Sequence, residues 1–183
     1  MYGNLIGVGG STALGQKLPL LSSLTELNLS GNRIDDHAVG CLVEGIANHP
    51  SLKKLCLGFN LIGDVGAEII ANQCLCSNNE CLDWLNLHNN PNIGEMGTTA
   101  LIQIGLASNY VLREMNIDWV RGTDQSLLEE MNMYLELNRA GRRILREENM
   151  GPFAWSCVLG GVATLSSIYY LVRLCPEMCE EGY

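Results

Sequence analysis

Three cysteines and a histidine lie close enough along the chain to suggest a metal site. Cys74, Cys76 and Cys81 are followed by His88, and thiolates with imidazole are the ligands that structural zinc prefers. The C-x-C-x4-C spacing, however, is not one that structural zinc sites commonly use. Cys74 also occupies a position that Ile46 fills one repeat earlier. We therefore interpret Cys74 as a small apolar core residue and predict no metal site.

The glycine-rich stretch GVGGSTALG, from Gly7 to Gly15, is the type of segment that can hold a phosphate. It lacks the Gly-Lys-Ser/Thr ending of a P-loop, and it does not fit the G-x-G-x-x-G frame of dinucleotide-binding loops. No complete strand precedes it. The sequence therefore predicts no cofactor.

The histidines and arginines form no catalytic pattern. His37, His49 and His88 have no serine, cysteine or aspartate at a spacing typical of a triad. We expect the first two at or near solvated turns. The arginines between residues 139 and 146 could hold a phosphate or an acidic lipid, but such a run is more often a solvated helix face. No catalytic residue is predicted, and the protein is expected not to be an enzyme.

Charge and composition narrow the class of protein. The 183 residues carry a net charge of −9, and 47% are hydrophobic, which is typical of a globular chain. The acidity argues against nucleic acid as a partner. The N-terminus lacks the charged and apolar regions of a secretory signal. We therefore interpret the eight cysteines as reduced thiols and predict a cytoplasmic location.

A repeat positions these residues. The segments LTELNLSGNRI, LKKLCLGFNLI, LDWLNLHNNPNI and LREMNIDWV begin at Leu24, Leu52, Leu82 and Leu112, in steps of 28, 30 and 30 residues. Each follows an L-x-x-L-x-L pattern whose alternation predicts a short strand. The spacing of the apolar residues then becomes helical, as in Val39, Leu42, Val43 and Ile46. Each unit is therefore expected to be a strand, a turn and a helix, and the units must stack.

Stacking of such units predicts an overall shape. Neighbouring strands pack about 4.8 Å apart, whereas helices need about 10 Å, so the parallel sheet should lie on the concave side and the helices on the convex side. The asparagine that ends a strand is expected to be buried and bonded to adjacent backbones, because a buried amide without partners costs about 1–3 kcal/mol. These structural asparagines are Asn4, Asn32, Asn60 and Asn90.

This pattern resembles the leucine-rich repeat, and the unit length and helical half are similar to the ribonuclease-inhibitor-like subfamily. The resemblance covers residues 1 to about 123 and implies an α/β solenoid in the form of a horseshoe arc. The third copy has an extra residue near Pro91. The fourth has Met115 and Ile117 in place of leucine and Val120 in place of asparagine, as expected of a terminal repeat.

Three parts are expected along the chain. Residues 1–20 are the back half of a repeat whose strand is absent. Either their helix serves as a cap or upstream repeats are missing, and we favour missing repeats. Residues 21–123 form the leucine-rich repeats. Residues 124–183 are expected to form a helical C-terminal cap, since NRAGR and IYYLVRLCPEM resemble the closing segment of some ribonuclease-inhibitor-like proteins.

Residues 153–172 offer an alternative to the cap. They are twenty residues without a charge, long enough to cross a bilayer, and basic residues precede them. In that case the protein would be tail-anchored, with its repeats facing the cytosol. Interrupting glycines and hydroxyl residues lower the hydrophobicity of this stretch, and we favour the cap.

The side chains between the strand leucines should point away from the core, towards the concave face. Tryptophan beside charged and amide groups is typical of protein interfaces, although the same residues could be ordinary solvated strand positions. We predict a protein partner on this face. The candidate binding residues are Glu26, Asn28, Lys54, Cys56, Phe59, Trp84, Asn86, His88, Glu114, Asn116, Asp118 and Trp119.

The resemblance implies a scaffold, regulator or inhibitor. Some ribonuclease-inhibitor-like proteins activate small GTPases, which is a second hypothesis for this chain. For that role the candidate residue is Arg33, the arginine that lies in a repeat turn.

Overall fold

The computed structural model describes residues 3–76, 79–118 and 125–141, together with Gly161. Within these ranges, short parallel strands form one four-stranded sheet whose order follows the chain. They are β1 (Glu26–Asn28), β2 (Lys54–Cys56), β3 (Trp84–Asn86) and β4 (Glu114–Asn116). Each strand begins two residues after the leucine that opens its repeat unit, so the parallel sheet expected from the sequence is confirmed.

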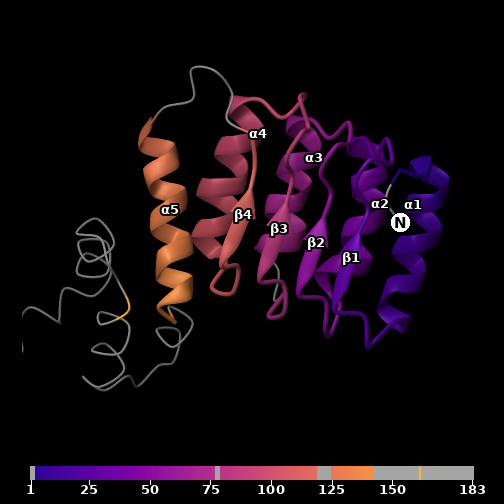
Figure 1. The fold of residues 1–183 in the computed structure, drawn as a ribbon, viewed down its shortest axis with the longest axis horizontal. Coiled ribbons are helices and arrows are strands. Elements are labelled where there is room, and N and C mark those ends of the chain that lie inside the picture. Colours follow the sequence, from indigo (N-terminus) through magenta and orange to yellow (C-terminus); the bar gives the residue numbers. More distant parts are fainter. Residues whose placement is uncertain (1–2, 77–78, 119–124, 142–160, 162–183) are drawn as a thin grey trace, which may run out of the picture.

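The helices lie side by side on one face of this sheet, and α5 stands beside β4 at the end of the stack (Figure 1). Helix α2 begins after Asp35, whose side chain accepts a hydrogen bond from the backbone N–H of Ala38 at 2.9 Å as an N-cap. The helical segments are α1 (Gly7–Lys17), the 3-10 turn η1 (Leu18–Leu20), α2 (Asp36–Ala47), α3 (Asp64–Ile69), η2 (Ile70–Leu75), α4 (Glu95–Thr99), η3 (Ala100–Leu106) and α5 (Gln125–Arg139).

Two of the helices change their winding part-way. Helix α3 continues as the π-helical segment η2, and α4 continues as η3. At the end of η2 the N–H of Cys76 donates to the carbonyl of Ala71, five residues earlier. Both π segments fall in the 30-residue units, whereas α2 in the 28-residue unit has none. A π-helical turn accommodates an additional residue, so these turns take up part of the extra length.

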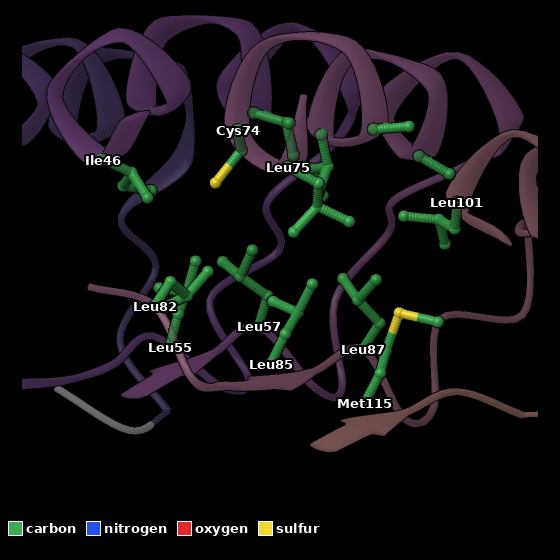
Figure 2. Close-up of a cluster of buried hydrophobic side chains, with 14 of the residues drawn as sticks. Ile46, Leu55, Leu57, Cys74, Leu75, Leu82, Leu85, Leu87, Leu101 and Met115 are labelled. Atoms are coloured by element: carbon green, nitrogen blue, oxygen red, sulfur yellow. The ribbon is translucent and has the colours of Figure 1, made fainter. Parts of the chain in front are cut away.

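The core is a single layer of side chains between the sheet and the helices. Leu55 and Leu85 point from their strands towards Cys74 and Leu101 on the helices (Figure 2). All four are at most 1% exposed. Cys74 therefore has the apolar core role expected from the repeat, and burial raises the pKa of its thiol to about 12.

The asparagines that lie four residues after the first three strands, Asn32, Asn60 and Asn90, are buried between adjacent units. The Oδ1 atom of Asn60 accepts hydrogen bonds from the N–H groups of Asn32 (2.9 Å) and Ile34 (3.1 Å) in the unit before. Its Nδ2 donates to the carbonyls of Leu29 (3.1 Å) and Leu57 (2.9 Å). Asn60 therefore joins the backbones of two units. Asn4 differs from this expectation, because it is exposed.

A second ladder of polar side chains follows the helices. Asn79 accepts from the N–H groups of Cys81 and Leu82 and donates to the carbonyl of Ile46 in the unit before. His49 holds the same position one unit earlier. Its Nδ1 accepts from the N–H groups of Ser51 and Leu52 at 3.3 and 3.0 Å, and its side chain is only 3% exposed. The expectation of a solvated His49 was therefore wrong. His37, in contrast, is exposed.

Helix α5 packs against the apolar layer next to the last strand. Leu127, Met131, Tyr134 and Leu135 belong to the same buried cluster as the repeat leucines. Asn138 extends the second ladder, donating to the carbonyl of Leu112 at 2.7 Å. The segment 153–172 lies outside the described residues. Among the helices of the described ranges, none is both long enough and apolar enough to cross a membrane.

Candidate protein-binding face

The strand positions between the leucines form a surface on the side of the sheet away from the helices, which we call the strand face. The parallel register places its side chains in two rows. The odd-numbered leucines that separate the rows are buried against the helices, which fixes the opposite direction of the strand-face side chains. The first row is Glu26, Lys54, Trp84 and Glu114, and the second is Asn28, Cys56, Asn86 and Asn116.

The first row combines an ion pair with an aromatic ring. Lys54 Nζ lies 2.9 Å from Glu26 Oε1. The hydrogen bond to Glu26 and its negative charge raise the pKa of Lys54 above its usual range, with smaller contributions from Asp83 and Glu114. Trp84 is half-buried next to Lys54 in the row. Because both charged groups are exposed, they contribute little to stability and are free to contact a partner.

A second group lies at the ends of the strands, and we call Phe59, His88 and Asp118 the exit cluster. The rings of Phe59 and His88 meet edge to face with centroids 5.7 Å apart. His88 Nδ1 lies 2.5 Å from Asp118 Oδ1, and the other carboxylate oxygen accepts the N–H of Asn89. The sequence has no aspartate at a spacing typical of a triad from His88. The stacking of units nevertheless brings Asp118, one repeat later, into contact with it.

The backbone at Phe59 adopts a conformation that suits other residue types better. Its φ is +56°, and the equivalent residues in the other units, Gly3, Gly31 and Asn89, have φ of +71°, +68° and +58°. Each immediately precedes the structural asparagine of its unit, which is Asn60 for Phe59. Glycine and asparagine adopt this left-handed region readily, whereas a bulky aromatic does so at a cost of about 1–2 kcal/mol. The Phe59 side chain is nevertheless 52% exposed.

A hollow of about 670 Å³ lies between the last strand and α5. Met115 and Leu135 contribute to its lining, together with polar residues from both elements. The helix side of this hollow was not predicted from the sequence, because the candidate residues stopped at the strands. Leu128, Asn132, Leu135 and Arg139 recur at helical spacing and would have indicated a common face. The polar residues that line it are Asn86, His88, Glu114, Asn116, Asn132 and Arg139.

The remaining candidate residues from the sequence have structural or solvent-exposed positions where the structure describes them. The stretch from Gly7 to Gly15 lies within helix α1. Cys76 and Cys81 donate their thiols to backbone carbonyls of Ile104 and Pro50. Within the described ranges, no three His, Cys, Asp or Glu side chains gather as a metal site would require. Arg33 is exposed in its turn, and Trp119 lies outside the described residues.

The comparisons with known proteins agree with this architecture. The leucine-rich-repeat family model matches residues 23–48. Among solved structures, the actin-binding site 2 of leiomodin-1 superposes with a TM-score of 0.69 at 19% identity, covering 80% of this chain and 83% of that one. The tropomodulin C-terminal domain of Caenorhabditis elegans gives 0.56 at 15% identity, covering 74% and 97%. No curated protein sequence gives a significant match.

The fold and the matched segment thus support a protein of the leucine-rich-repeat type. At these identities the solved structures establish the likeness of fold.

Proposed function

We propose that this protein is a non-enzymatic interaction module that binds a protein partner through the strand face and the adjoining exit cluster, with Trp84 and Phe59 as the anchors. The observation that carries the proposal is Phe59. The fold needs a left-handed residue at this position, and the other units use glycine or asparagine there. The chain instead places a half-exposed aromatic ring at a point where it is conformationally costly.

The surroundings of Phe59 suit recognition of a protein. His88 fixes the edge of the Phe59 ring, and Asp118 in turn fixes His88. Rigid aromatic side chains bordered by polar groups are typical of interface centres, because they bury apolar area at little cost in conformational entropy. We extend the proposal to a curved, ribonuclease-inhibitor-like arrangement in which this face is concave, to a C-terminal cap formed from residue 124 onwards, and to a cytoplasmic location.

The test is affinity capture from cell extract with the whole chain as bait, beside a Phe59→Asn variant and a Trp84→Ala variant. Asparagine at residue 59 keeps the backbone conformation that Asn89 already adopts, so a loss of binding would not reflect unfolding. Leu20→Asn is the matched control, because Leu20 is 73% exposed and lies on η1, away from the strand face.

The proposal predicts a partner that is retained by the unaltered chain and by Leu20→Asn and is lost from the Phe59→Asn and Trp84→Ala variants. Equal retention by all four baits would overturn it. Monomeric actin is the first defined partner to test, because the leiomodin domain is named as an actin-binding site. Fluorescence anisotropy with labelled monomeric actin would show whether that partner is shared.

A further inference from the structure

A groove lies on the helix side of the protein, away from the strand face, between α3–η2 and α4–η3. Its walls carry apolar side chains that stand in solvent: Val65 is 60% exposed, Met96 78% and Ile104 39%. The groove has a volume of about 510 Å³, and Ala100 lies in its lining. Isolated exposed apolar residues need no explanation, but three that line one groove form a patch.

Carboxylates border this groove. Asp64 accepts hydrogen bonds from the N–H groups of Gly94 and Gly97 at 2.6 and 2.8 Å, which holds the start of α4 against α3. Glu68 and Glu95 also line the groove and are exposed. The segments α2, α3, η2, α4 and η3 contain no lysine or arginine. The field over the groove is therefore negative, with no basic side chain on the helices that form it.

The apolar character is specific to this pair of helices. At the matching positions one repeat earlier, Val65 corresponds to His37 and Ile104 corresponds to Gln73. The repeat fold therefore does not require apolar residues there. The packing of α3 against α4 uses buried residues such as Ala67 and Leu101 instead, so the exposed side chains are available for a contact.

We propose that this groove docks a basic amphipathic helix of a partner protein. A groove between two adjacent helices matches the ridge of a third helix, and helix-in-groove recognition uses apolar anchors at helical spacing. Val65, Met96 and Ile104 receive the anchors, and the flexible Met96 adapts to their shape. Glu68 and Glu95 pair with the lysines or arginines that flank these apolar anchors on the partner helix. This docking site is independent of the strand face.

The experiment uses the whole chain and a defined probe. The probe is a fluorescein-labelled synthetic peptide with leucine at positions i, i+3, i+4 and i+7 and lysine elsewhere, titrated by fluorescence anisotropy at low and moderate salt. A second peptide has glutamate in place of every lysine. We expect saturable binding of the lysine peptide, weakened by salt, and no binding of the glutamate peptide.

Three variants separate docking from general attraction to an acidic protein. Met96→Ser should weaken binding about tenfold, as the loss of a buried apolar anchor would. The double variant Glu68→Gln/Glu95→Gln should weaken it and reduce its salt dependence. Glu44→Gln removes an exposed carboxylate of α2 outside the groove and should leave the affinity unchanged.

Two results would overturn the proposal. One is an affinity that Met96→Ser leaves unaltered, because the apolar groove would then make no contact. The other is a loss with Glu44→Gln as large, for each charge removed, as that with Glu68→Gln/Glu95→Gln, because the peptide would then follow net charge only. Urea unfolding of Met96→Ser, whose side chain is mostly in solvent, checks that the variant is folded.

Discussion

Gly15 and Gly45 meet backbone to backbone where helices α1 and α2 pack. A Cβ on Gly45 would lie 2.2 Å from the carbonyl oxygen of Gly15, and a Cβ on Gly15 would lie 2.1 Å from that of Cys41. No side chain fits at either position. Part of the glycine content that suggested a phosphate loop is therefore required by helix packing, and the first helix sits unusually close to the second.

Replacement of Gly45 by alanine should therefore destabilise the protein. Overpacking against a rigid backbone carbonyl costs about 1–3 kcal/mol, and the added Cβ meets backbone rather than a flexible side chain. Urea unfolding followed by circular dichroism measures the change. Gly40→Ala is the matched control on the same helix, because its Cβ would lie 4.0 Å from the nearest heavy atom, on Ile69. It should stabilise by about 0.5–1 kcal/mol. Equal effects of the two substitutions would argue against the contact.

The repeat made much of this fold predictable from sequence. A strand period of two, a helical period and a repeat of 28 to 30 residues are all readable in one chain, and they place Leu55, Asn60 and Cys74 correctly. The strand register followed from the same alignment of units, so the rows of the strand face could be named from the amino-acid sequence alone.

Contacts that depend on how the units pack in space were harder to predict from the sequence. The second ladder has one polar residue per unit as its only signal, three positions before the opening leucine, and histidine replaces asparagine at residue 49. The conformation of Phe59 is set by the turn rather than by its own preference. The hollow beside α5 depends on where that helix packs, which no repeat period specifies.

Asn60 should be one of the most sensitive polar positions. Alanine at this residue would leave the N–H groups of Asn32 and Ile34 without their acceptor. Each buried group left unpaired costs about 1–3 kcal/mol, so we expect the free energy of unfolding in urea to fall by at least about 2 kcal/mol. Asn28→Ala, on an exposed strand-face asparagine, is the control and should change stability far less. A loss of under about 1 kcal/mol for Asn60→Ala would contradict the ladder.

Two single substitutions, Phe59→Asn and Asn89→Phe, should show how much stability an aromatic residue costs in this left-handed conformation. Phe59→Asn removes the left-handed strain of a bulky residue but also the edge contact with His88, worth about 0.5–1 kcal/mol, so stability should stay level or rise slightly. Asn89→Phe places an aromatic in the same conformation one unit later and should cost about 1–2 kcal/mol. Differential scanning calorimetry of both variants measures the effects. A clear loss with Phe59→Asn would show that Phe59 is retained for stability, and the functional argument would then fail.

Cys74 should make stability depend on pH in the alkaline range. Burial raises its pKa from 9.0 to about 12, so the unfolded chain releases this proton at a lower pH than the folded protein. The folded state then binds more protons, and the free energy of unfolding falls between about pH 9 and pH 12, by up to about 1.4 kcal/mol per pH unit. Cys74→Ala removes this term. Its urea midpoint under reducing conditions should be below that of the unaltered protein at pH 7 and should approach it by pH 10. Parallel curves would contradict the burial of the thiol.

His49 offers a substitution that should stabilise the protein. Its Nδ1 accepts two backbone N–H groups, but its buried Nε2 has no hydrogen-bond partner among the described residues. Asn79 and Asn109, in the same place of later units, use their amide nitrogens to donate to helix-end carbonyls at 3.1 Å. Asparagine at residue 49 can keep the acceptor and supply a donor towards the end of α1. We expect a gain of about 1 kcal/mol from His49→Asn and a loss of about 2–3 kcal/mol from His49→Ala, whose backbone N–H groups lose their acceptor. Thermal unfolding of the two variants distinguishes a role of residue 49 in hydrogen bonding from a role in filling space. If asparagine and alanine destabilise equally, the position is held by the bulk of the imidazole ring and the second ladder begins only at Asn79.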